Sequence, residues 1–207
     1  MNNTLIKKGE STREKILSVA EVMILERGFS GTSLNDIVAG SGLTKGAFFH
    51  HFSGKDELAA AVVKRYTHKD LSRFEAFSKQ AAKLADDPLQ EVMIFLKLFE
   101  DFLEELNAPP SGCVFATYTY EKQLFNMGIQ NLVTDGFKGW SKYYEVKFRK
   151  LLKARKPKTP VTAKDLAEMI MAIIEGGFVI SRSYSDKTLT IRLSKQFRNY
   201  LKLLFED

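Results

Sequence analysis

The chain has 207 residues, a net charge of +6 and a single cysteine. That length predicts one large domain or two modest ones, with a core that needs no disulfide or metal to form. One cysteine excludes an intramolecular disulfide and a zinc site built from four thiolates. No apolar run approaches the roughly 20 residues that cross a bilayer, and no signal peptide is visible, so we expect a cytoplasmic protein without a membrane partner.

The spacing of apolar residues and the scarcity of proline, five in all, predict an all-α protein of about nine helices. The expected helices span about 12–27, 33–39, 44–52, 53–83, 88–106, 113–126, 129–155, 162–183 and 188–205. Capping pairs are expected at three of the starts: Ser11 with Glu14, Ser53 with Asp56, and Thr162 with Asp165.

Charge is concentrated in two stretches of these helices. Residues 138–158 carry nine Lys or Arg and one acid, whereas residues 86–105 carry seven acids and one lysine. The basic stretch is a candidate nucleic-acid surface. Charge runs on helices are usually solvated faces, however, and both stretches fit that interpretation, which we favour for the basic one.

Residues 12–66 have the arrangement of a helix-turn-helix, in which a glycine turn at 40–42 separates the second short helix from the third. Phe48 and Phe52 are four residues apart and therefore share one face of the third helix, which we expect to be buried.

The opposite face of that helix carries Lys45, Phe49 and His50, with Thr44 at the N-terminus, where a phosphate is favoured. The small residues at 46 and 47 leave room for close approach. Lysine can donate to guanine or phosphate, and an aromatic ring can touch a thymine methyl. This face is therefore suited to the major groove of DNA.

The motifs in this segment are Gly28-Phe29, Thr32-Ser33, Asp36-Ile37, Gly42-Leu43-Thr44-Lys45-Gly46-Ala47, His51-Phe52 and Lys55-Asp56-Glu57-Leu58. Together they resemble the N-terminal domain of the TetR family of bacterial transcriptional regulators. The resemblance covers the first third of the chain and is highly specific. It implies an all-helical homodimer that binds palindromic operator DNA, usually represses transcription, and is released by a small-molecule effector.

The resemblance implies a DNA-binding domain at residues 1–55 and a helical effector-binding and dimerisation domain at 56–207. The residues expected to approach bases and phosphates of double-stranded DNA are Thr32, Ser33, Thr44, Lys45, Gly46, Ala47, Phe49, His50, His51 and Lys55. Lys55 and the two hydroxyls of Thr32 and Ser33 are expected at phosphates. The family commonly has tyrosine where this chain has Phe49, so the ring is kept and a phenolic hydrogen bond is lost.

The rest of the chain resembles the family in architecture. The Glu175-Gly176-Gly177 motif inside an apolar helix fits the penultimate helix of such proteins. The last two helices are then expected to form a four-helix interface with those of a second copy. The residues expected in this interface are Leu166, Ile170, Ile173, Leu189, Leu193, Phe197, Tyr200 and Leu204.

The expected effector is a small hydrophobic or aromatic molecule, because its cavity would need aromatic walls. The candidate walls are Phe95, Phe99, Phe102, Cys113, Tyr118, Trp140, Tyr144, Glu175 and Phe178. Core packing explains most of these rings as well. Cys113 stands at an expected helix N-terminus, which favours a reactive thiolate that senses oxidants or electrophiles, whereas free cysteine is more often a small buried apolar residue.

An enzyme and a helical adaptor are the alternative functions. The sequence offers no nucleophile–base pair, no phosphate-binding glycine loop and no metal cluster, so we expect neither an enzyme nor a cofactor. His50 and His51 are adjacent and point about 100° apart on a helix, which makes them a poor chelating pair. A helical adaptor that has lost operator binding stays an alternative, supported by Phe49.

Overall fold

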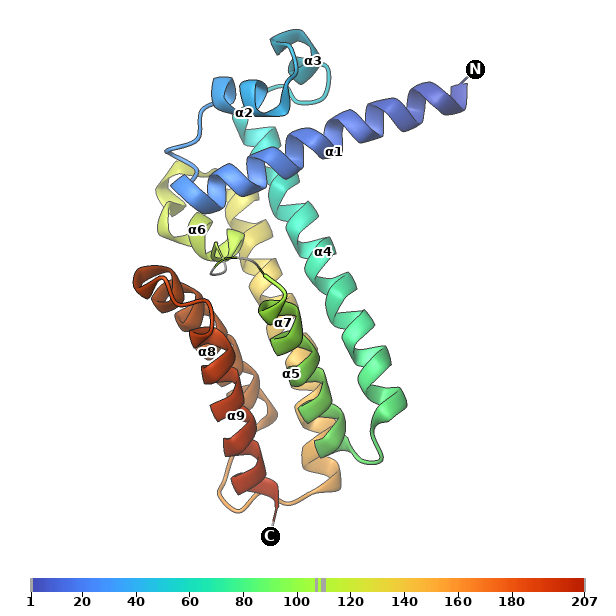
Figure 1. Ribbon diagram of the computed structural model, residues 1–207, viewed down its shortest axis with the longest axis vertical. Coiled ribbons are helices and arrows are strands. Elements are labelled where there is room, and N and C mark those ends of the chain that lie inside the picture. Colours follow the sequence, from blue (N-terminus) through green and yellow to red (C-terminus); the bar gives the residue numbers. More distant parts are fainter. Residues whose placement is uncertain (1, 107, 109–110, 207) are drawn as a thin grey trace. The chain divides into compact units, whose positions relative to one another are not determined.

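The structure is a computed structural model that describes residues 2–106, 108 and 111–206, with side chains from residue 11 onward. The described residues form nine α-helices and one 3-10 helix, so the predicted all-α class is confirmed (Figure 1). In chain order these are α1 (Asn2–Arg27), α2 (Leu34–Ser41), α3 (Lys45–Phe49), α4 (Lys55–Leu84), α5 (Pro88–Glu104), α6 (Val114–Tyr120), η1 (Lys122–Leu124), α7 (Met127–Ala154), α8 (Ala163–Tyr184) and α9 (Leu189–Phe205). No described helix is long and apolar enough to cross a membrane.

The chain divides into two compact units. The first contains the residues up to His68 together with Cys113–Gly136, and the second contains Lys69–Gly112 and the residues from Phe137 onward. The helices α4 and α7 each continue from one unit into the other. The functional division expected at residue 55 stays a prediction. The first unit does not end there, because it also contains the rest of α4 up to His68 and the segment Cys113–Gly136.

Caps and a glycine define the short helices of the first unit. The Ser33 hydroxyl accepts the Asp36 N–H at 3.1 Å, and the Asp36 carboxylate accepts the Ser33 N–H at 3.0 Å, which makes a capping box at α2. α2 ends at Gly42, whose φ of 63° lies in the left-handed region that glycine adopts without strain. The core beneath these helices includes Ile16, Ala20, Ile24, Ile37, Phe48 and Phe52, all buried.

Some predicted helix starts are wrong. α1 begins at Asn2, so Ser11 lies inside the helix and does not cap it. At the start of α4, the Ser53 N–H and hydroxyl donate to Glu57, at 2.8 Å and 2.7 Å, instead of to Asp56. The predicted capping box of Thr162 with Asp165 at α8 is confirmed.

The single helix expected over 113–126 is two pieces, α6 and η1. Glu121, between them, has φ −108° and ψ 26°, which is outside the helical region. The Gln130 side-chain amide donates to the Phe125 carbonyl at 2.7 Å and to the Lys122 carbonyl at 3.3 Å. The Lys122 carbonyl also accepts the Phe125 N–H at 3.2 Å, so the Gln130 side chain ties both ends of η1 to the start of α7. Between the helices expected over 88–106 and 113–126, residues 107, 109 and 110 lie outside the described residues.

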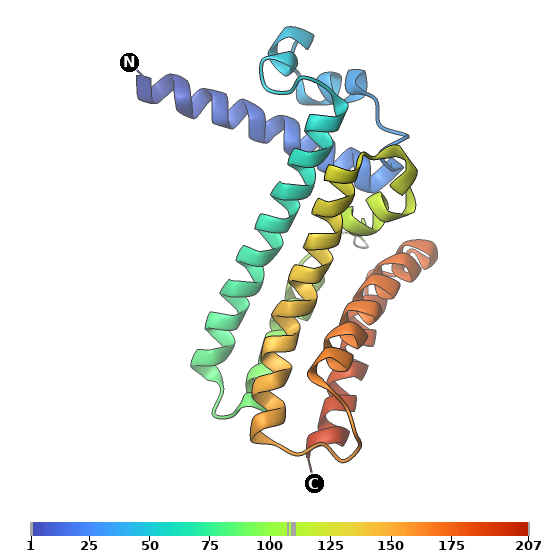
Figure 2. The same cartoon turned by 180° about the vertical axis from the view of Figure 1, so that it is seen from behind.

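In the second unit α9 packs against both α8 and α5, and α8 and α9 run side by side (Figure 2). A Cβ at Gly177 would lie 2.9 Å from Thr190 Oγ1 and 3.2 Å from Thr190 Cα, so glycine permits this close approach of α8 and α9. The buried hydroxyls of Ser181 and Thr190 are hydrogen-bonded at 2.9 Å across the same contact.

A buried ionic network joins α5 to α9. The Glu100 side chain is fully buried and accepts hydrogen bonds from Ser194 Oγ at 2.8 Å, Arg198 Nε at 2.9 Å and Arg198 Nη2 at 2.7 Å. Each oxygen of the buried carboxylate therefore has a donor, which is what a charge needs inside a protein.

The two charged stretches contact each other in the second unit. The Lys150 ammonium pairs with Glu91, and Arg155 Nη2 lies 3.0 Å from an Asp87 carboxylate oxygen. The basic end of α7 thus lies against the acidic start of α5. The interpretation of these stretches as solvated faces does not include this pairing, because charge composition does not show which helices become neighbours.

Candidate nucleic-acid interface

The helix α3 has the two faces expected from its sequence. Phe48 and Phe52 are buried with 1% exposure each, whereas Phe49 is 54% exposed. The Phe49 ring stands edge-on to Phe48 at 5.4 Å between centroids, so the buried ring supports the exposed one. Thr44, Lys45, Gly46 and His50 are also exposed, and we call these four residues with Phe49 the α3 face.

A threonine cap precedes α3 and small residues lie in its first turn, as the sequence suggested. Thr44 caps the helix, since its hydroxyl accepts the Ala47 N–H at 3.2 Å. Nothing but the Thr44 hydroxyl, at 4.0 Å, comes near a Cβ placed at Gly46, which leaves open space for close approach of a ligand. Ala47 and His51 are half-buried at the edge of the α3 face.

Thr32 does not belong to the exposed surface. Its side chain is fully buried, and its hydroxyl donates to the Gly28 carbonyl at 2.8 Å. The expected phosphate contact from this hydroxyl is therefore inconsistent with the structure. Ser33 is exposed, but its hydroxyl donates to the Asp36 carboxylate at 2.7 Å as part of the α2 cap.

Lys55 is half-buried instead of fully exposed. Its ammonium donates to the Phe29 carbonyl at 2.6 Å and lies 4.1 Å from the centre of the Phe29 ring. Burial lowers the pKa of Lys55 below its usual range, and the Glu121 carboxylate nearby opposes that shift. The ammonium expected at a DNA phosphate is thus engaged inside the protein.

Two further residues near this region, Arg13 and Glu121, are not among those expected from the sequence. Arg13 of α1 lies over the Phe52 ring at 5.0 Å, which adds a cation beside α3. Glu121 binds the segment between α1 and α2 from 92 residues away. Neither contact has a local signal in the sequence, because both depend on elements that meet only in the folded unit.

The residues expected around an effector fall in both units. Phe95, Phe99, Trp140 and Tyr144 are buried in the second unit around Phe74, with Phe102, Glu175 and Phe178 half-buried. Cys113 and Tyr118 are buried in the first unit, where Tyr118 stacks on Phe125 at 4.4 Å and lines a cavity of about 250 Å³. Burial raises the pKa of both Tyr118 and Tyr144.

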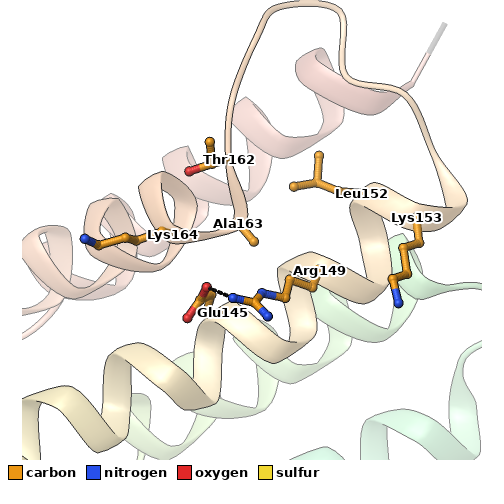
Figure 3. A pocket seen from close by; sticks show the side chains of 7 residues that line it. All are labelled: Glu145, Arg149, Leu152, Lys153, Thr162, Ala163 and Lys164. Carbon is orange, nitrogen blue, oxygen red and sulfur yellow. Dashed lines mark hydrogen bonds and ion pairs between the residues drawn. The ribbon is translucent and has the colours of Figure 1, made fainter.

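Figure 3 shows a different cavity, of about 420 Å³, between the end of α7 and the start of α8. Its lining consists of Glu145, Arg149, Leu152, Lys153, Thr162, Ala163 and Lys164, and Arg149 is paired with Glu145 inside it. None of the residues expected to bind an effector lines this cavity. Its three basic side chains also make it unlike the expected aromatic pocket.

The residues expected in a dimer interface are mostly inside the chain's own core. The buried ones are Leu166, Ile170, Leu189, Phe197 and Leu204. Ile173, Leu193 and Tyr200 are half-buried. On α8 the apolar surface that remains exposed includes Met169 and Ile180, at 39% and 38%. The assignment of the five buried residues to a partner contact is therefore corrected, because they pack within one copy.

Comparison with known proteins agrees with this architecture. Residues 16–62 match the family model of bacterial regulatory proteins of the tetR family, and residues 88–196 match that of the LmrA/YxaF-like transcriptional regulator C-terminal domain. The chain is 28% identical to the HTH-type transcriptional regulator LmrA of Bacillus subtilis, over 92% of this chain and 97% of that protein. It is 30% identical to the uncharacterized HTH-type transcriptional regulator YxaF of the same organism, over 93% and 95%.

The fold has equally extensive matches. A crystal structure of a TetR transcriptional regulator from Chloroflexus aurantiacus superposes with a TM-score of 0.80 at 24% identity, over 96% of this chain and 98% of that one. The crystal structure of a TetR-family regulator from Agrobacterium tumefaciens superposes with a TM-score of 0.77 at 22% identity, over 95% of this chain and 99% of that one. Regulators of this family bind DNA and usually act as dimers with small-molecule effectors. The chain belongs to the TetR family of transcriptional regulators and carries a C-terminal domain of the LmrA/YxaF-like type.

Proposed function

We propose that this protein is a dimeric repressor that binds a palindromic operator in double-stranded DNA and acts in the cytoplasm. The observation that carries the proposal is the α3 face, where Lys45 and Phe49 are exposed above the buried rings of Phe48 and Phe52. A relative of 24% identity from Mycolicibacterium smegmatis is named the HTH-type transcriptional repressor KstR2, which supports repression over activation.

The dimer that we propose uses the exposed apolar side of α8. Met169, Ile173, Gly176 and Ile180 recur at helical spacing, so they form one stripe along the helix, which we call the α8 stripe. No atom lies within 4 Å of a Cβ placed at Gly176, which leaves room for a second helix to approach. On α9, Leu203 is a further exposed apolar residue, with 74% of its surface accessible. Such a stripe is typical of a helix that packs against a partner.

The effector that we propose is a small hydrophobic or aromatic molecule bound among the aromatic residues of the second unit. Phe74 contacts five neighbouring rings there, and Tyr143 donates to the Phe74 carbonyl at 2.6 Å. The effector lowers DNA affinity only by as much as its own affinity differs between the two states of the protein. Cys113 is the N-cap residue of α6, but its 2% exposure favours a packing role over thiol sensing.

The test of this function is in-vitro selection of random duplex DNA by the purified protein without effector. We expect enrichment of a two-fold-symmetric motif, whose half-sites lie one or more helical turns apart, roughly 34–36 Å per turn. Absence of enrichment at low salt, from a folded dimer, would instead support the adaptor that has lost operator binding. Catalytic turnover is not part of the proposal, because the relatives named above are regulators.

Replacing Lys45 with alanine tests the α3 face directly. We expect the loss of about 1–3 kcal/mol of operator binding free energy and a flatter base preference at the position that the lysine contacts. Titration of labelled operator and of single-base variants measures both effects. Lys64→Ala is the control, because Lys64 is also an exposed cation but lies on α4, outside the α3 face. Equal affinities of the two variants would show that the α3 face does not contact DNA.

A further inference from the structure

The segment between α1 and α2, residues 28–33, is held by a side chain from a remote part of the chain. The Glu121 carboxylate accepts the Phe29 N–H at 2.7 Å, the Ser30 N–H at 3.3 Å and the Ser30 hydroxyl. A carboxylate is a strong acceptor for the backbone N–H groups of this turn. We call residues 28–33 the α1–α2 corner.

Gly28 makes this contact possible in two ways. Its φ of +79° is a left-handed conformation that side-chain-bearing residues rarely adopt. A Cβ at this position would also lie 2.8 Å from Glu121 Oε1. The glycine that ends α1 therefore both turns the chain and admits the carboxylate.

Lys55 binds the backbone carbonyl of Phe29, the residue whose N–H is bound by Glu121. The Lys55 ammonium donates to the Phe29 carbonyl, so both backbone groups of Phe29 are bound by charged side chains of other elements. The Phe29 ring packs against Tyr118 at 5.6 Å and Phe125 at 4.6 Å, on either side of Glu121 in the sequence. The corner is thus fixed by apolar contacts as well as by charge.

We propose that Glu121 is a positioning residue for DNA recognition, which acts through Phe29 and Lys55 to fix the α1–α2 corner and the helices that follow it. The corner leads directly into α2, because the buried Thr32 hydroxyl bonds back to Gly28 and Ser33 caps the helix. α2 in turn packs against α3. The proposal rests on the proposed function, since it concerns how well the α3 face is presented to DNA.

Electrostatics and positioning predict opposite results for Glu121→Gln. Removing a negative charge near a DNA-binding surface strengthens binding if charge alone matters. Loss of positioning weakens it instead, because glutamine lacks the second acceptor oxygen and the charge that faces Lys55. We expect operator affinity to fall roughly tenfold, while affinity for scrambled DNA stays the same or rises slightly. The slope of affinity against salt stays unchanged, because Glu121 is not expected to contact a phosphate.

The experiment measures operator and scrambled-duplex affinity for the full chain, the Glu121→Gln variant and Asp56→Asn, together with hydrogen exchange at Phe29 and Ser30. Asp56 is the matched control, since its exposed carboxylate follows Lys55 and its hydrogen bond from Asn126 is a long 3.4 Å. We expect faster exchange and lost discrimination in Glu121→Gln alone. A purely structural role would lower both affinities equally, through the folded fraction.

Three outcomes would overturn the proposal. Glu121→Gln could discriminate between operator and scrambled DNA as well as the wild type does, or it could lose the same affinity for both DNAs. Asp56→Asn could also show the same loss of operator affinity as Glu121→Gln. If the wild-type protein itself does not discriminate, the proposed function fails and the positioning role fails with it. If Glu121→Gln does not fold, Ser30→Ala takes its place, because it removes one donor to Glu121 and leaves the charge. A two- to threefold loss of discrimination is then expected, and none would contradict the proposal.

Discussion

Replacing Glu100 with alanine is expected to lower the free energy of unfolding by about 3–5 kcal/mol. The Glu100 side chain is fully buried between α5 and α9, and Arg198 is 20% exposed. Alanine leaves the Arg198 guanidinium and the buried Ser194 hydroxyl without their acceptor, and an uncompensated buried charge is more costly than the loss of the pair itself. Denaturant unfolding followed by circular dichroism measures the change.

Asp101→Ala is the matched control for this prediction. Asp101 follows Glu100 on α5 and pairs with Lys97, but both of these side chains are about 45% exposed. Exposed pairs contribute about 0–1 kcal/mol, so this variant is expected to unfold nearly as the wild type does. The double variant Glu100→Ala, Arg198→Ala should cost less than the sum of its single changes. Similar losses for Glu100→Ala and Asp101→Ala would contradict the stabilising role of the buried network.

Local signals in the sequence were enough to predict most helices. The proline at 88 with Asp87 before it, the Thr162 capping box and the glycine at 42 mark real helix ends, because each acts within a few residues. The α3 face was predicted for the same reason, since residues four apart on a helix necessarily share a side. Ser11 failed as a cap because a helix continues through a good capping residue when the preceding segment is also helical.

Contacts between distant segments could not be predicted in this way. Glu121 and Glu100 are ordinary members of acidic or mixed stretches, and their partners lie more than 90 residues away. Charge composition shows that acids and bases are present, but the fold decides which of them meet. The same limit applies to Lys55, whose motif suggests a phosphate contact while its ammonium is bound to the Phe29 carbonyl.

The dimer residues show a third kind of limit. Apolar positions on α8 and α9 were assigned to a partner, although Leu166, Ile170 and Phe197 pack within the chain. An apolar helical stripe indicates that a face is buried, but it does not tell whether the covering surface belongs to the same copy. Burial in the single chain separates the two cases, and it is the reason why we propose the α8 stripe, and not the buried residues, as the surface for a partner.

Replacing Ile180 with glutamate is expected to prevent dimer formation and abolish specific operator binding. Ile180 belongs to the α8 stripe and is 38% exposed in the single chain. A glutamate there is solvated in a monomer but loses water when two copies pack together, which is costly for an unpaired charge. A monomer reaches one half-site only. Its affinity is therefore expected to fall from about 10⁻⁸–10⁻¹¹ M toward the non-specific range of about 10⁻⁴–10⁻⁶ M.

Sedimentation equilibrium and operator titration on the same samples measure both parts of this prediction. Val146→Glu is the control, because Val146 is 57% exposed on α7 and the change introduces the same charge at an apolar surface position. We expect Val146→Glu to remain dimeric and to bind operator as the wild type does. A dimeric Ile180→Glu variant with normal affinity would show that the α8 stripe is not the contact between copies. A monomeric variant with normal affinity would show that recognition does not depend on two copies acting together.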